Sequence, residues 1–278
     1  MKTLKNHTIL YDADCPLCRA YTGAFIRTEM LDKEGRVPYQ ITGGAFCPGL
    51  DSSRAKNEIA LLNRENGEVT YGIDSLVKIL GNRFQFIGFI FRFPPLRFIF
   101  KRIYSFISYN RKVIIPAKAD VNADFACVPD FRADYRIAYL LFTWFISSLV
   151  LLNYSKLLSG LIPPSSFHRE FFICGGQIAF QFISVGLLNK NKVADYLGNM
   201  MTISFTGSLL LLPAIIFASL SNFHLPIFFA GYFMLVVGLM LLEHFRRMKI
   251  LGLGWWPSIS WVLYRMIVLS VLIFYNHS

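Results

Sequence analysis

The stretch Ile9-Leu10-Tyr11-Asp12-Ala13-Asp14-Cys15-Pro16-Leu17-Cys18 decides how the first part of the chain folds. It opens with the end of a short apolar run that is typical of a buried strand. Two cysteines then flank Pro16, a residue favoured in the first turn of a helix because it has no N–H to leave unpaired. Apolar residues recur at helical spacing from there to about Met30. The stretch therefore predicts a strand, a tight turn and a helix that begins with a Cys-X-X-Cys motif.

The segments that follow extend this unit into an α/β domain. Residues 36–41 predict a second strand, and residues 58–63 and 68–71 predict a hairpin around Asn66-Gly67, because glycine accepts the positive φ of such a turn. Residues 73–80 predict a helix that ends at Gly81. The order β-α-β-β-β-α, with the cysteines at the start of the first helix, predicts a thioredoxin-like core.

Charge divides the chain into two parts. Residues 1–136 hold 20 Lys and Arg with 14 Asp and Glu, whereas residues 137–278 hold only 8 and 3. The second part contains five long apolar runs, each of a length that suits a helix crossing a hydrocarbon layer of about 30 Å. We therefore predict a thioredoxin-like domain over residues 1–113, a linker over 114–136 and an all-α transmembrane bundle over 137–278. The five expected spans are 137–157, 171–188, 200–220, 226–242 and 259–275.

Residues 84–109 are rich in aromatic side chains and are divided by Pro94-Pro95. In the second piece, apolar residues share one helical face while basic and hydroxyl side chains share the other, which predicts a basic amphipathic helix. Two interpretations are open. The helix covers one face of the sheet, or it lies on a lipid surface.

The loops predict the orientation of the spans. Basic residues follow the second and fourth spans, so the positive-inside rule places the first domain in the cytoplasm and the carboxyl end outside. No apolar run near Met1 is long enough for the core of a secretory signal. The excess of Lys and Arg lies among phenylalanines and in short loops, which favours anionic membrane lipid as a partner and argues against nucleic acid. The chain is thus expected to be a multi-pass integral membrane protein.

The cysteine pair suits thiol–disulfide exchange with a thiol or disulfide substrate. Such exchange needs one thiol that ionises near neutral pH and a second thiol that resolves the mixed disulfide. Cys15 at the N-cap would be favoured as thiolate by the helix dipole, and Cys18 lies one turn along. Asp12 and Asp14 oppose ionisation of Cys15, so either the dipole outweighs them or one carboxylate accepts the proton of Cys18.

Three other interpretations compete with this one. A structural zinc site normally needs four ligands, but Cys47, Cys127 and Cys174 are isolated, so we expect no metal and no other cofactor. Asp12 and Asp14 also fit the Asp-X-Asp of haloacid-dehalogenase-like phosphatases, in which one Asp is the nucleophile and the other the acid. In the third, the chain is a non-enzymatic membrane scaffold, or a transporter-like protein with a regulatory redox domain.

The opening stretch, with Asp-X-Asp-Cys-Pro-X-Cys at residues 12–18, resembles the signature of the DCC family of predicted thiol-disulfide oxidoreductases. Tyr71-Gly72-Ile73-Asp74-Ser75 is similar to the family's Gly-X-Asp-Ala segment, and Tyr104 to Arg111 is similar to its closing Tyr with Asn-Arg. The resemblance covers residues 8–113 and implies a thioredoxin-like fold with redox thiols at Cys15 and Cys18. Unlike thioredoxins, the chain has no proline before the strand that begins near Glu58, where thioredoxins dock a substrate backbone.

The second expected span carries polar side chains on one face, namely Cys174, Gln177, Gln181 and Ser184. Hydrogen bonding between helices is one interpretation, and a buried site for a quinone-like molecule is the other. Arg265 is costly inside a membrane, and Glu243 is its expected partner.

Overall fold

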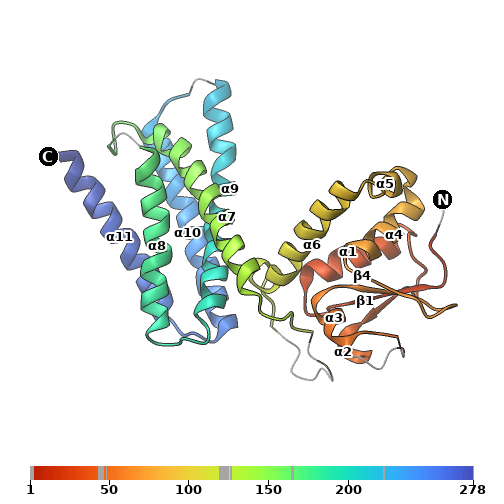
Figure 1. Ribbon diagram of the computed structural model, residues 1–278. Coiled ribbons are helices and arrows are strands. Elements are labelled where there is room, and N and C mark those ends of the chain that lie inside the picture. Colours follow the sequence, from red (N-terminus) through yellow and green to blue (C-terminus); the bar gives the residue numbers. More distant parts are fainter. Residues whose placement is uncertain are drawn as a thin grey trace. The chain divides into compact units, whose positions relative to one another are not determined.

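The computed structural model shows two compact units, Met1–Arg136 and Ile137–Ser278 (Figure 1). The structure describes residues 3–42, 47, 49–118, 125, 127–163, 166–221 and 223–277.

The first unit is built on a mixed four-stranded sheet in the order β2-β1-β3-β4. Strand β1 runs parallel to β2 and antiparallel to β3, and β3 forms a hairpin with β4. All five residues of β1 are buried, as expected for a central strand covered on both faces. The strands are β1 (His7–Tyr11), β2 (Arg36–Pro38), β3 (Ala60–Asn63) and β4 (Val69–Tyr71).

Helices cover the two faces of this sheet. One core packs Ile9 and Leu61 of the strands against helices α1 and α4, and the other packs Leu10 and Ala60 against α2 and α3. The alternation of Ile9 and Leu10 between the cores follows from the period of two in a strand. The helices of this unit are α1 (Pro16–Arg27), α2 (Tyr39–Thr42), α3 (Ser52–Asn57), α4 (Ile73–Arg83), α5 (Gln85–Ile90) and α6 (Pro94–Ile114).

The predicted thioredoxin-like α/β fold is confirmed, including the hairpin at Asn66-Gly67, where Gly67 has a φ of +72°. Three details of the prediction are wrong. The second strand ends at Pro38, and residues 39–42 form α2 instead. Helix α4 continues through Gly81 to Arg83. Helix α3 was not expected, because its six residues are mostly polar and lack an apolar period.

Residues 84–109 form α5 and most of α6, which begins at Pro94. Only the last turns of α6 cover the sheet. Its buried residues are Ser108, Asn110, Arg111 and Val113, and Tyr104 packs partly buried against the first core. Residues 97–103 of α6 are exposed, so the interpretation that this helix covers the sheet holds for its last turns alone.

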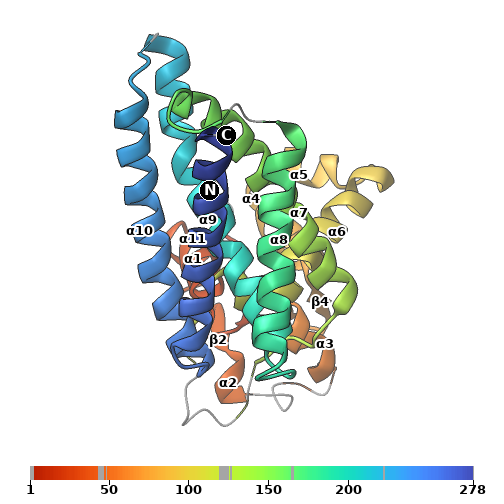
Figure 2. The ribbon, with the colours of Figure 1, turned by 90° about the vertical axis from the view of Figure 1, so that its left-hand side faces the viewer.

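The second unit is a bundle of long helices (Figures 1 and 2). Four candidate spans among the described residues are long and apolar enough to cross a membrane: Ala133–Leu158, Val193–Ser221, Pro226–Leu251 and Trp256–Phe274. The expectation of about five spans approximately matches this count. The run expected at 171–188 lies in α8, whose first turn holds Arg169 and Glu170 and whose middle holds Gln177 and Gln181. The helices are α7 (Ala133–Ser155), α8 (Phe167–Gly186), α9 (Val193–Ser221), α10 (Pro226–Leu251) and α11 (Trp256–His277).

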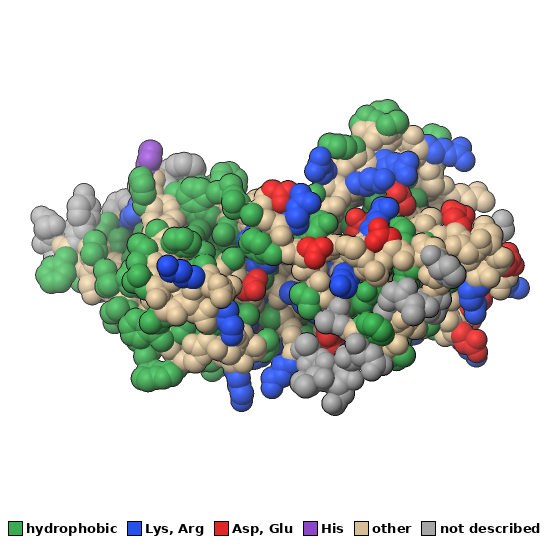
Figure 3. All heavy atoms as spheres, turned by 60° about the horizontal axis from the view of Figure 1, so that its bottom comes forward, with side chains coloured by type: hydrophobic (Ala, Val, Ile, Leu, Met, Phe, Trp, Pro, Cys, Tyr) green, Lys and Arg blue, Asp and Glu red, His purple; other side chains and the backbone are tan. Residues whose placement is uncertain are grey.

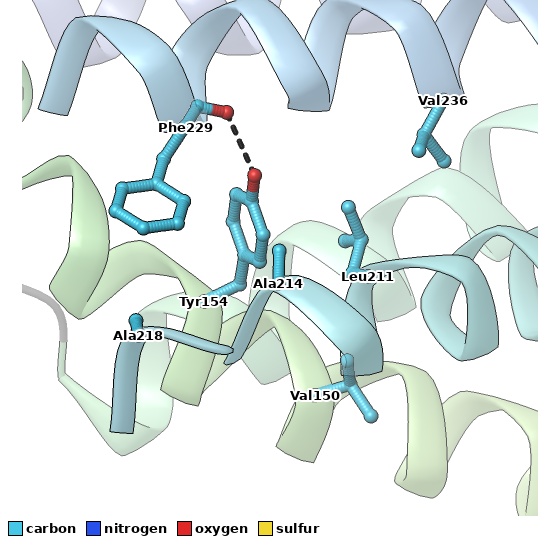
Figure 4. Packing of buried hydrophobic residues seen from close by; sticks show 7 residues of the cluster. All are labelled: Val150, Tyr154, Leu211, Ala214, Ala218, Phe229 and Val236. Carbon is cyan, nitrogen blue, oxygen red and sulfur yellow. Dashed lines mark hydrogen bonds between the residues drawn. The ribbon is translucent and has the colours of Figure 1, made fainter. Parts of the chain in front are cut away.

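The bundle is apolar outside as well as inside. Figure 3 shows hydrophobic side chains over much of its visible face, as expected for helices surrounded by lipid. One internal cluster packs Tyr154 against α9 and α10, and the Tyr154 hydroxyl donates a hydrogen bond of 2.7 Å to the carbonyl of Phe229 (Figure 4). Such a bond satisfies the one polar atom of a buried tyrosine.

The polar side chains of α8 bind other helices. The Gln181 carbonyl oxygen accepts hydrogen bonds from the hydroxyls of Tyr196 (2.7 Å) and Ser260 (2.9 Å). Arg265 donates to Gln177 and stacks on the Trp261 ring. Glu243 pairs with Arg246 and Arg247 on its own helix, so the expected pair between Glu243 and Arg265 is wrong. These bonds join the side-chain oxygens of Gln177 and Gln181 on α8 to neighbouring helices.

Candidate active site

The two cysteines of the motif lie at the start of α1, directly after the central strand. Cys15 is the N-cap residue, and its Sγ accepts a hydrogen bond from the Cys18 backbone N–H at 3.4 Å. Pro16 occupies the first helical position, where its missing N–H costs nothing. Both cysteines are free thiols and are nearly fully buried. The local fold thus brings both thiols to the positive end of one helix.

The two thiols have opposite acidities. The hydrogen bond from the Cys18 thiol lowers the pKa of Cys15 from 9.0 to about 6, with a further contribution from the Cys18 backbone N–H, against the opposing effects of burial and of Asp12. The pKa of Cys18 is raised well above its ordinary value by its hydrogen bond to Cys15 and by burial. One thiolate and one thiol, sharing a proton, are therefore favoured near neutral pH.

Asp12 is the buried centre of a charged cluster. Its Oδ2 lies 3.3 Å from Arg111 Nε and 3.2 Å from Lys112 Nζ. Its Oδ1 accepts hydrogen bonds from the Gln40 side chain (2.8 Å) and the Asp14 backbone N–H (3.0 Å). Two cations and two further donors thus surround this carboxylate.

Arg111 ties the last turns of α6 to the sheet domain. Its guanidinium also donates to the carbonyls of Lys56 (2.8 Å) and Asn57 (3.1 Å), and it lies 3.7 Å from the Cys127 Sγ. Burial raises the pKa of the Cys127 thiol to about 12, so this third cysteine stays protonated. Cys127 therefore contributes packing at this position, with little nucleophilic character.

A cavity of about 190 Å³ lies beside Cys18. Asp12 and Arg111 form its charged side, and Leu17, Tyr21 and Ile107 contribute apolar surface. Of the described residues, Cys15 and Asp14 are not among those that line it. The cavity is thus a place where a small group can reach Cys18 and the Asp12–Arg111 pair together.

Tyr104 binds the backbone directly before β3. Its hydroxyl accepts the backbone N–H of Ile59, directly before β3, at 3.0 Å. Gly72 lies against the same ring with a φ of +61°, and a Cβ there would meet Glu58 and Tyr104. The Ile59 N–H is therefore already used within the domain.

The predicted site residues lie together, but the sequence did not predict several side chains that contact them. Cys15, Cys18, Asp12 and Asp14 lie within one strand–helix turn, as their adjacency requires. Lys112 and Gln40 contact Asp12 from segments distant in the sequence, and neither belongs to a sequence motif that predicts this contact. Arg111 does belong to a motif, the Asn-Arg pair that resembles the closing motif of the DCC family.

Comparison with known proteins agrees with this geometry. Residues 9–115 match the family model described as DCC1-like thiol-disulfide oxidoreductase. The resemblance of the N-terminal domain to this family is thereby confirmed, and four apolar helices long enough to span a membrane follow it. No curated protein and no solved structure matches the chain.

Proposed function

We propose that the N-terminal domain of this membrane protein catalyses thiol–disulfide exchange through Cys15 and Cys18. One observation carries the proposal: the Cys15 sulfur sits at the N-cap of α1 and accepts the Cys18 N–H, and the pKa of Cys15 is lowered to about 6. Most Cys15 would then be thiolate at neutral pH, and the thiolate is the attacking species.

The exchange proceeds in two steps. The Cys15 thiolate attacks one sulfur of a substrate disulfide, and the other sulfur leaves as a thiolate that takes a proton from water. Cys18 then loses its proton and attacks Cys15, which releases the second substrate thiol and leaves a Cys15–Cys18 disulfide. The substrate gains two electrons, and two external thiol groups, oxidised to one disulfide, must return them to the domain.

The proton of Cys18 needs an acceptor during the second step. Asp12 and Glu58 both line the cavity that contains Cys18, so each brings a carboxylate acceptor to it. Asp12 directly precedes the cysteine motif, which supports a role in which Asp12 takes the Cys18 proton briefly when Cys15 no longer shares it.

The phosphatase alternative is less well supported. A nucleophilic Asp12 would need a free carboxylate oxygen, whereas both oxygens are occupied by Arg111, Lys112, Gln40 and the Asp14 N–H. A phosphatase mechanism predicts magnesium-dependent hydrolysis that is lost in Asp12→Asn and kept in Cys15→Ser. The scaffold alternative predicts that a double Cys15→Ser, Cys18→Ser variant keeps the protein's cellular effect.

A redox titration tests the exchange directly. The full-length protein in detergent is equilibrated with mixtures of reduced and oxidised glutathione, and free thiols are then counted by mass spectrometry. We expect a two-electron couple that is absent in Cys15→Ser and retained in the matched variant Cys47→Ser. Cys18→Ser should instead accumulate a mixed disulfide at Cys15. A couple that survives in Cys15→Ser would refute the assignment.

We further propose that the thiol domain faces the cytoplasm. Lys190 and Lys192 follow α8, and Arg246, Arg247 and Lys249 lie in the last turns of α10, so these ends are expected on the cytoplasmic side. The reducing cytoplasm would then favour the dithiol form of the pair.

A further inference from the structure

Residues 84–107, called here the aromatic arm, expose large apolar side chains to an extent unusual for a water-soluble domain. The arm comprises α5 and the first part of α6. Phe86, Phe89 and Phe98 are 62%, 74% and 60% exposed. Other large apolar side chains of the arm that are exposed are Phe84, Ile90, Phe93, Ile99, Phe100, Ile103 and Ile107. A contiguous exposed surface of this kind indicates an interaction site.

The apolar residues of α6 form a stripe along the helix. At 100° per residue, Leu96, Ile99, Phe100, Ile103 and Ile107 fall on one side. The stripe runs for about three turns, or roughly 17 Å. Only three residues separate the end of α5 at Ile90 from the start of α6 at Pro94. The phenylalanines of the two helices are therefore close together along the chain. A long, narrow apolar stripe on an exposed helix suits the boundary between headgroups and acyl chains.

The arm is also basic. Residues 75–119 contain nine Lys and Arg and no Asp or Glu. Arg97 and Lys101 pair with Asp74 of α4 at 3.1 and 3.0 Å, which holds α6 against α4. Arg92 and Arg102 are exposed, and the Arg102 guanidinium lies 5.1 Å from the centre of the Phe98 ring. Figure 3 shows Lys and Arg gathered beside hydrophobic side chains on this unit. Such a surface is complementary to anionic lipid.

A bilayer is also within reach of the arm. The first candidate span begins at Ala133, and α6 ends at Ile114. The 18 intervening residues can bridge at most roughly 60 Å when extended. Any membrane that holds the spans is therefore present near the arm at high effective concentration.

We propose that the aromatic arm lies in the headgroup region of an anionic bilayer, with the exposed phenylalanines of α5 and the α6 stripe toward the acyl chains and Arg92 and Arg102 beside lipid phosphates. Ile107 ends the stripe and also lines the cavity beside Cys18. Ile107 therefore belongs both to the proposed membrane contact and to the lining of the cavity at the candidate active site.

Photocrosslinking of the full-length protein in vesicles tests the proposal. Ile103, which lies on the stripe and is 47% exposed, is replaced by p-benzoylphenylalanine, and the control replaces Ile41, which is 66% exposed on α2, outside the arm. In vesicles of phosphatidylcholine with phosphatidylglycerol, irradiation should attach lipid at position 103 and none at position 41. A crosslink from position 103 to residues 137–278 of the same chain, or to a second copy, would show that protein covers the arm and would overturn the proposal. Absence of any adduct at position 103 would also overturn it.

Charge removal tests the choice of anionic lipid. The double variant Arg92→Gln, Arg102→Gln should lower the ratio of docked to undocked arm by about fivefold for each charge, because a basic residue near an anionic surface is worth about 1 kcal/mol. The adduct yield should fall accordingly. The control Lys5→Gln, Lys33→Gln removes two exposed charges elsewhere and should leave the yield unchanged. Equal yields in the two double variants would refute a role for headgroup charge.

Discussion

Asp12 and Arg111 act on Cys15 with opposite signs. The Asp12 carboxylate raises the pKa of Cys15 and the Arg111 guanidinium lowers it. Asp12→Asn should therefore lower the pH at which Cys15 is half ionised, and Arg111→Gln should raise it. The pH dependence of Cys15 alkylation by iodoacetamide, followed by mass spectrometry, measures this midpoint.

A matched variant separates this effect from a general change of charge. Arg97→Gln removes an exposed guanidinium from the same helix and should leave the midpoint in place. Arg111→Gln also leaves Asp12 buried with only Lys112, so we expect a loss of about 3 to 5 kcal/mol in the stability of the domain. Midpoints that move in the same direction in Asp12→Asn and Arg111→Gln would contradict the assigned electrostatics.

The lowered pKa of Cys15 also sets how the reduction potential depends on pH. Below about pH 6 both thiols of the reduced pair are protonated, so two electrons are accompanied by two protons. Above that pH only Cys18 carries a proton, and the slope should halve to about 30 mV per pH unit. Ionisation stabilises the reduced form above the folded pKa, and this stabilisation is lost as the pH falls through about 6. Glutathione titrations between pH 5 and 8 should show the break, and a single slope throughout would exclude it.

The residues of the site divide into those that the sequence could predict and those that it could not. Cys15, Cys18 and Asp12 are neighbours along the chain, so a strand–turn–helix pattern was enough to bring them together. Arg111 is 99 positions from Asp12 and Gln40 is 28 positions away. Their contacts depend on how α2 and α6 pack on the sheet, and no local pattern encodes that.

At the level of elements, the anchor of α6 on the sheet depends on Tyr104. Its ring packs in the core and its hydroxyl accepts the Ile59 N–H. Tyr104→Phe leaves that donor without its partner, at a cost of about 1 to 3 kcal/mol. Amide hydrogen exchange at Ile59 should accelerate accordingly.

Tyr71→Phe is the matched control, because the Tyr71 hydroxyl accepts an exposed N–H, that of Asp51. Water can replace this bond, so hydrogen exchange at Ile59 should stay as in the parent protein. Equal exchange at Ile59 in the parent and in Tyr104→Phe would mean that α6 is held by its other contacts alone.

Elements with a strong local signal were predicted well. The hairpin follows from Asn66-Gly67, and α1 follows from its proline and its apolar period. Helix α4 runs three residues beyond the predicted end at Leu80, because a glycine such as Gly81 inside a helix costs only about 1 kcal/mol and packing overrides it. The strand after Arg36 was too long because Tyr39 and Gln40 turn into α2, where both are buried.

At the scale of the whole molecule, the bundle keeps its polar groups inside. Gln181 binds Tyr196 and Ser260, and Arg265 lies between Gln177 and Trp261. Sequence could place Gln177 and Gln181 on one face of a helix, but it could not select their partners on α9 and α11. These contacts make α8 an integral part of the helical unit even though its composition is less apolar than that of the four candidate spans.

Whether α8 crosses the membrane determines on which side the later loops lie. If α8 crosses, the chain passes five times, and the segment between α9 and α10, which contains His224, faces outside while the thiol domain faces the cytoplasm. If α8 does not cross, that segment lies on the same side as the thiol domain. The loop charges after α8 and in α10 favour five crossings.

Cysteine labelling distinguishes these two topologies. Glu65→Cys places a thiol in the exposed hairpin turn, and His224→Cys places one in the exposed segment after α9. Both are made in a Cys47→Ser, Cys174→Ser background because these two native cysteines are partly exposed. Cys15 and Cys18 are too buried to report reliably. On intact cells, a membrane-impermeant maleimide should label position 224 and reach position 65 only after permeabilisation. Labelling of position 65 on intact cells would overturn the cytoplasmic location, and protection of both positions would show that α8 does not cross.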